Sequence, residues 1–305
     1  MTGAGQRGVA IVLAMGVVAL AAMAAVAIMV TQSTWARHSE LTSDHVQAQA
    51  LLQAGVDWSR SVLSVDRRMS NIDHLGEPWA LRLAPVPVEN GEVTGYIEDQ
   101  QGAFNLTNLV SAGKVNLAQL EHFRRLLAIL GLPAVLADAL ADWVDADSQP
   151  QPQGGAEDGY YLALQAPYLA ANRPLIDVGE LALVRGFDEN VRARLRPFVT
   201  ALPRSTPVNV NTASPEVLAA IVEGMDLDSA RALVARRNKA YFRNGQEFMS
   251  RIPPGFTVAT EDITVSSDYF MVTLRVTIGQ AEARGMALLA REDIFWPVIV
   301  WRKFL

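Results

Sequence analysis

The sequence predicts an α+β protein in which one long N-terminal helix packs on an antiparallel sheet and a large α-helical domain is inserted into that sheet. No proline precedes Pro78, strand-like segments occur at 79–106 and 263–305, and helical periodicity fills the interval between them. We therefore expect a leader at 1–8, an apolar span at 9–30, the helix and first strands at 31–111, the inserted domain at 112–258, and the last strands at 259–305.

Composition excludes several classes of function. The 305 residues carry a net charge of −6, which disfavours nucleic acid as a partner, and the lack of cysteine excludes disulfides and thiolate chemistry. The four histidines form no His-Glu-x-x-His motif, and no Gly-x-Ser-x-Gly elbow or phosphate-binding loop occurs. We interpret the chain as a non-enzyme, and we expect His38 and His45 on the surface.

The N-terminal region predicts a membrane anchor. No charged residue lies between Gly8 and Ala36, and Val9–Val30 is almost wholly aliphatic. This stretch is long enough to cross a hydrocarbon core of about 30 Å. Arg7 before the span and Arg37 after it give only a weak bias toward a cytoplasmic N-terminus.

The residues before the span indicate how the anchor is processed. No Ala-x-Ala site follows Val30, whereas Gln6-Arg7-Gly8 followed by Val9 resembles a type IV prepilin leader that prepilin peptidase cuts between Gly8 and Val9. The resemblance implies N-methylation of Val9. An uncleaved signal anchor is the alternative. Most pilins carry Glu at the fifth mature position, and Leu13 there suits a subunit with no neighbour above it, because an unpaired carboxylate in a bilayer is costly.

The soluble region continues the same helix. Thr31–Ser64 is helix-compatible, so a helix from Val9 to Leu63 would be on the order of 80 Å long. Its apolar positions predict an amphipathic half that lies against a sheet: Leu41, Val46, Ala50, Leu51, Ala54, Val56, Trp58, Val62 and Leu63.

Strand and helix signals follow in order. We expect a strand-like segment at Trp79–Val88, and a hairpin in which Val93–Ile97 turns at 100–102 into Ala103–Leu106. Helices are expected at Asn116–Leu130, Pro133–Val144, Val178–Val184, Glu189–Leu195, Pro215–Val222 and Ser229–Asn238, with Ser214 as an N-cap. The last strands are expected at Tyr269–Ile278, Arg284–Ala290 and Ile294–Trp301.

Three weak repeats in the inserted domain open a rival function. Each has a helix, a Gly-apolar turn at Gly131, Gly186 or Gly224, and a second helix, which resembles helix-hairpin-helix or SAM-like repeats. The run 208–213 (VNVNTA) resembles the start of such domains in DNA-uptake proteins, so a membrane-anchored DNA-binding protein is the alternative. The second glycine that lets a phosphate approach is replaced, however, by Pro133, Asp188 and Asp226. We read the repeats as packing units, and the basic run 231–239 as a solvated helix face.

An acidic loop is the candidate metal site. Five carboxylates surround a Gln/Pro/Gly loop at 148–155, and a hard cation such as calcium would supply their counter-charge: Asp142, Asp145, Asp147, Glu157 and Asp158. The spacing does not fit an EF-hand, and a solvated acidic loop stays the alternative.

The combined order of elements resembles the type II secretion protein K family of minor pseudopilins. The resemblance spans nearly the whole chain and rests on the leader with Leu13 and on the segments 97–109 (IEDQQGAFNLTNL), 140–160, 167–186 and 208–213.

This resemblance implies a pseudopilin fold, one pass through the bacterial inner membrane, and a C-terminal domain in the periplasm. It also implies calcium binding by the inserted domain, and a place at the pseudopilus tip with minor pseudopilins I and J. The protein would cap the filament there and support the export of folded proteins, which are themselves candidate partners.

Overall fold

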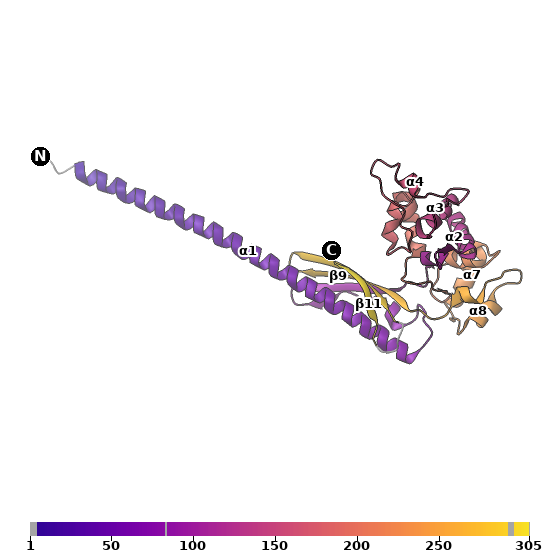
Figure 1. Ribbon diagram of the computed structural model, residues 1–305. Helices are drawn as coiled ribbons and strands as arrows, with labels where there is room; N and C mark the ends of the chain where they lie inside the picture. The colour runs from indigo at the N-terminus through magenta and orange to yellow at the C-terminus, as the bar shows by residue number, and fades with distance from the viewer. Residues whose placement is uncertain (1–4, 83, 292–295, 305) are drawn as a thin grey trace.

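One unbroken helix dominates the fold. The computed structural model describes residues 5–82, 84–291 and 296–304, and helix α1 (Gly5–Met69) has 65 residues (Figure 1). At 1.5 Å per residue α1 is about 100 Å long. It runs one and a half turns beyond the predicted end at Leu63, and Arg67 and Arg68 in its last turn complement the negative end of the helix dipole.

The N-terminal half of α1 stands clear of the rest of the protein (Figure 1), and residues 9–43 are all exposed. Its most apolar window has a mean hydropathy of 2.7 and no buried residue. Within the described residues, α1 is the one helix long and apolar enough to cross a membrane. His38 and His45 lie on its exposed surface, as expected.

The C-terminal half of α1 packs on a five-stranded antiparallel sheet. The strand order is β1 (Val86–Val88), β2 (Gly91–Asp99), β9 (Tyr269–Ile278), β10 (Ala281–Ala290), β11 (Val298–Phe304). Ala48, Leu52, Val56 and Leu63 are fully buried against β9 and β10. This arrangement confirms the predicted α+β pseudopilin fold.

The strand predicted from a long alternation of apolar and polar residues is confirmed, whereas the predicted hairpin is wrong. Strand β9 has the predicted bounds, β10 begins earlier than predicted, and β11 is displaced toward the C-terminus from 294–301, of which 294 and 295 lie outside the described residues. The hairpin is wrong, because β2 pairs with β1 and β9, while β3 (Phe104–Asn105) pairs in parallel with β6 (Val199–Thr200). The segment 79–88 is a strand only at its end, since Pro78–Ala80 forms a 3₁₀ helix.

The chain between β2 and β9 forms a second body with its own core, which runs from Phe104 to Ile263. Its remaining elements are η2 (Leu106–Leu109), β4 (Val110–Ser111), β5 (Lys114–Val115), α2 (Leu117–Ile129), α3 (Val135–Val144), α4 (Asp158–Tyr161), η3 (Val178–Leu183), α5 (Glu189–Leu195), η4 (Arg196–Phe198), β7 (Val208–Asn209), α6 (Pro215–Ile221), α7 (Leu227–Arg237), α8 (Gly245–Arg251), η5 (Thr260–Asp262) and β8 (Ile263–Thr264). We call it the head, and α1 with its sheet the body.

Local capping explains most of the predicted helices. The Asn116 side chain caps α2, Ser214 caps α6 by accepting from the Val217 N–H, and α5 has the predicted bounds. The predicted helix at Val178–Val184 is a 3₁₀ helix instead. Neither α4 nor α8 was predicted from the sequence.

The head is attached at the end of the sheet that lies farther from the N-terminus (Figure 1). Leu202 of the head packs with Tyr269 and Leu288 of the sheet. Arg204 pairs with Asp268 at 3.0 Å, and Lys303 at the end of β11 pairs with Asp177 of the head. Apolar and ionic contacts therefore fix the head to the body.

Candidate functional site

The acidic loop connects α3 to α4 and brings separated carboxylates together. Asp145 follows the last turn of α3 as its C-cap, and Glu157 is the N-cap residue of α4. Asp145, Asp147 and Glu157 each present one carboxylate oxygen, and these three oxygens lie within 4.8 Å of one another. The loop folds back on itself between these helices, so residues twelve positions apart converge.

Two of the three carboxylates are buried and have oxygens that lack a hydrogen-bond donor among the described residues. Asp145 is 1% exposed and Glu157 is 7% exposed. Asp145 Oδ1 and both Glu157 carboxylate oxygens have no hydrogen-bond partner among the described residues. Burial, followed by the neighbouring negative charges, raises the pKa of Glu157 to about 7 and that of Asp145 to about 6. Because unpaired buried carboxylates are costly, a divalent cation with oxygen ligands fits this arrangement.

The other two predicted ligands have protein partners. Asp142 is fully buried, and both its carboxylate oxygens lie 3.1 Å from the Gln151 N–H. Burial raises the pKa of Asp142 to about 6. Asp158 accepts a hydrogen bond of 2.9 Å from the Ala170 N–H. The structure thus gathers Asp145, Asp147 and Glu157, places Asp142 beside the loop, and uses Asp158 to hold a neighbouring segment.

An aromatic cluster flanks this loop. Trp143, two residues before Asp145, makes an edge-on contact with Tyr161 at a centroid distance of 5.0 Å. Tyr161 stacks on Tyr168 at 5.3 Å. Arg185 lies over the Tyr160 ring and donates to the Gly155 carbonyl at 3.2 Å. Trp143, one of six tryptophans in the chain, therefore lies where its fluorescence would respond to order in the loop.

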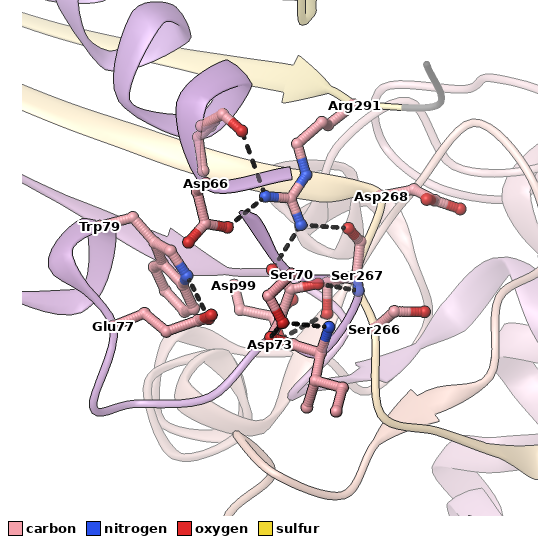
Figure 2. A network of polar contacts seen from close by, with 12 residues as sticks. Asp66, Ser70, Asp73, Glu77, Trp79, Asp99, Ser266, Ser267, Asp268 and Arg291 are labelled. Atoms are coloured by element: carbon pink, nitrogen blue, oxygen red, sulfur yellow. Dashed lines mark hydrogen bonds and ion pairs between the residues drawn. The ribbon is translucent and has the colours of Figure 1, made fainter. Parts of the chain in front are cut away.

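A second acidic group lies where the head meets the body, and it contains its own cation. Asp66, Asp73 and Glu77 present oxygens within 4.8 Å of one another. The fully buried Arg291, directly after β10, pairs with Asp66 at 2.7 Å and also with Asp73 (Figure 2). Its guanidinium also lies 4.5 Å from the Phe270 ring centroid. Arg291 supplies the counter-charge that a metal would supply elsewhere, and sequence reasoning gave this arginine no role.

The run 208–213 belongs to the same junction. Asn209 Nδ2 donates to the Asp73 carbonyl, to Asp99 Oδ2 and to Ser267 Oγ, at 2.9 to 3.1 Å. Thr212 Oγ1 donates to Asp99 Oδ2 at 2.5 Å. These residues of the run therefore hold the head to the ends of β2 and α1.

The turns of the three weak repeats contain left-handed glycines, with φ of 62° at Gly131, 84° at Gly186 and 78° at Gly224. The carboxylates of Asp188 and Asp226 cap the helices that follow two of them. The repeat assignment itself stays a prediction. The interpretation of 231–239 as a solvated face is wrong for Arg237, which is 6% exposed and donates to the carbonyls of Val210 and Ala213.

The proposed cleavage site lies within α1. Gly8 and Val9 are both helical, and Val9 is 61% exposed. Residues 1–4 of the predicted leader lie outside the described residues.

Comparison with known proteins gives a consistent result. Two family models described as type II secretion system (T2SS), protein K match residues 102–204 and 208–266. A "Type II secretion system protein K" from Pseudomonas aeruginosa is 38% identical over 94% of this chain and 89% of its own length. One from Klebsiella pneumoniae is 33% identical over 96% of this chain and 95% of its own length.

A solved structure has the same fold. A chain from the crystal structure of the GspK-GspI-GspJ complex of the enterotoxigenic Escherichia coli type 2 secretion system superposes with a TM-score of 0.78. It is 25% identical, and the match covers 88% of this chain and 99% of that one.

Proposed function

This chain belongs to the type II secretion system protein K family, and we propose that it is a minor pseudopilin that caps the tip of a periplasmic pseudopilus. The family is a structural component of the secretion apparatus and is not a family of enzymes. The proposal rests above all on the position of the head, at the end of the sheet away from the apolar helix (Figure 1).

Steric exclusion is the mechanism. In a filament whose subunits pack through parallel helices like α1, the next subunit would be added beyond the end where the head lies. The head is as large as a domain and is fixed to the body by Leu202, by the Arg204–Asp268 pair and by the hydrogen bonds of Asn209 to Asp73 and Asp99. A subunit of this shape can start or end a filament, and it cannot sit within one. Such a filament would support export of folded proteins across the outer membrane.

We infer that minor pseudopilins I and J are its partners, and that they link it to the rest of the pseudopilus. The similar solved chain comes from a complex named for three such proteins. The apolar half of α1 would lie in the inner membrane and the C-terminal domain in the periplasm.

Site-specific labelling tests the cap. The sequence has no cysteine, so Gln246→Cys on the exposed surface of α8 provides a single site for maleimide-gold. Pseudopili assembled with this variant should carry gold at one end. A cysteine in the major pseudopilin, as the control, should give label along the whole length. Gold from Gln246→Cys along the shaft would rule out the capping role.

We also propose that prepilin peptidase cuts between Gly8 and Val9 and that Val9 becomes N-methylated. N-terminal sequencing of the membrane form should then begin at methylated Val9. A membrane form that keeps Met1 would identify an uncleaved signal anchor instead.

We further propose that calcium binds Asp145, Asp147 and Glu157, with Asp142 beside them. The buried carboxylate oxygens without donors support this proposal. Calcium bound there would neutralise the cluster and order the loop. Addition of calcium to chelator-treated full-length protein in detergent should raise the melting temperature and change the tryptophan fluorescence, to which Trp143 beside the loop contributes. Glu157→Gln should remove both effects, whereas Asp228→Asn, at an exposed surface carboxylate, should retain them. Equal responses in both variants would exclude this site.

A further inference from the structure

The junction between head and body contains more buried negative charge than positive charge. Four carboxylates and one guanidinium gather here: Asp66 lies in the last turn of α1, Asp73 and Glu77 follow that helix, Asp99 ends β2, and Arg291 follows β10 and pairs with Asp66 and Asp73 (Figure 2). Asp66, Asp73 and Glu77 are each at most 9% exposed. We call these five residues the junction cluster.

Asp99 connects the body directly to the head. Its Oδ2 accepts from the Thr212 hydroxyl at 2.5 Å, from Asn209 Nδ2 at 3.0 Å and from the Ser267 hydroxyl at 2.7 Å. Its Oδ1 accepts from the Gln101 N–H at 2.8 Å. Asn209 and Thr212 belong to the head, and Ser267 lies in the segment that joins the head to β9. Because a hydroxyl can rotate from donor to acceptor, Thr212 and Ser267 can also serve a protonated Asp99.

Glu77 affects the contact between body and head indirectly, through His74. Its Oε2 accepts from the His74 N–H at 2.9 Å and from Trp79 Nε1 at 2.8 Å. These bonds hold the segment that carries the His74 ring, which stacks on Tyr241 of the head at a centroid distance of 3.9 Å. A change in the charge of Glu77 therefore acts on a contact between the two bodies.

We propose that the junction cluster is a pH-responsive latch, which holds the head on the body most tightly when the cluster has bound protons and loosens as those protons are lost. One guanidinium cannot neutralise four carboxylates, and a buried uncompensated charge is costly. Protons supply the remaining neutralisation without any change in the fold.

The pKa values of the clustered carboxylates determine how the stability of the closed junction changes with pH. Burial raises the pKa of Glu77 to about 7 and that of Asp99 to about 6, and it raises the pKa of Asp66. These values lie above those of the open, solvated groups, so the closed junction is stabilised at low pH and loses that stability as pH rises through 6 and 7. Burial lowers the pKa of His74 below its ordinary 6.5, so His74 opposes the effect toward the acidic end of this range.

Hydrogen exchange of the full-length protein in detergent tests the latch. The reporters are peptides that contain the N–H groups of Asp73, Asn209 and Ser267, which bond across the junction. After correction for intrinsic exchange rates, the opening constant should rise on the order of tenfold between pH 6 and pH 8, a factor that follows from the pKa values above. A peptide from the buried middle of β9 provides the internal control for global unfolding.

Variants assign the effect to the cluster. The double variant Glu77→Gln/Asp99→Asn should remove the pH dependence, whereas Glu98→Gln should keep it, because Glu98 faces Arg82 at 3.6 Å outside the junction. The pH profile of the natural sequence is a test in itself if the double variant does not fold. A flat profile between pH 6 and 8 would overturn the proposal. An unchanged slope in the double variant, or a slope lost in Glu98→Gln, would also overturn it.

Discussion

Replacement of Arg291 by methionine tests the central contact of the junction. The Arg291 guanidinium is fully buried, and it donates to Asp66, Asp73 and the Ser267 carbonyl. Methionine keeps the apolar stem that lies near Phe270 and removes the charge. Asp66 and Asp73 then remain in the interior without their counter-ion.

The structure sets the expected size of the loss. Removing one partner of a buried ion pair costs about 3–5 kcal/mol, because the other charge stays buried. At roughly 2–4 °C per kcal/mol for a domain of this size, the melting temperature should fall on the order of 10 °C.

Differential scanning calorimetry of the full-length protein in detergent measures this loss. Arg284→Met is the matched control, since Arg284 lies on β10 in an exposed pair with Glu282 at 2.6 Å, and such a pair contributes at most about 1 kcal/mol. Adding Asp73→Asn to Arg291→Met should restore part of the stability. If Arg291→Met and Arg284→Met melt at the same temperature, our account of the junction as a buried ion-pair network is wrong.

Three further predictions concern the metal site and the two cores. Calcium affinity should rise from pH 6 to pH 8 as Glu157, with a pKa of about 7, loses its proton, and calorimetric titrations giving equal affinities would contradict this. Leu126→Ala, at a fully buried position of the head, should lower the free energy of unfolding by about 2–5 kcal/mol in urea titrations, and a loss below about 1 kcal/mol would contradict the packing seen there. Gly95→Ala should destabilise the body by about 1–3 kcal/mol in the same assay, because its methyl group would lie 2.7 Å from the Thr273 carbonyl oxygen; unchanged stability would show that β9 moves aside.

Several parts of this protein could be predicted from local sequence because local energetics decide them. The absence of proline before Pro78 determines an unbroken α1, and strict alternation over 269–278 determines β9. The Ser214 cap determines where α6 begins. The five carboxylates of 142–158 could be found from the sequence because they lie close together along the chain, around one loop.

The sequence did not predict the contacts between residues far apart in the chain, because these depend on how the whole chain folds. Local turn chemistry indicated a hairpin at 93–106, whereas β2 gains more by pairing along its whole length with β9, which lies about 180 residues later in the chain. Only the folded structure shows that Asp145 Oδ1 and both Glu157 carboxylate oxygens lack donors among the described residues, whereas Asp158 accepts a hydrogen bond from the Ala170 N–H. The role of Arg291 arises only because the ends of α1, β2 and β10 meet at one point, and no local pattern encodes such a meeting of distant charges.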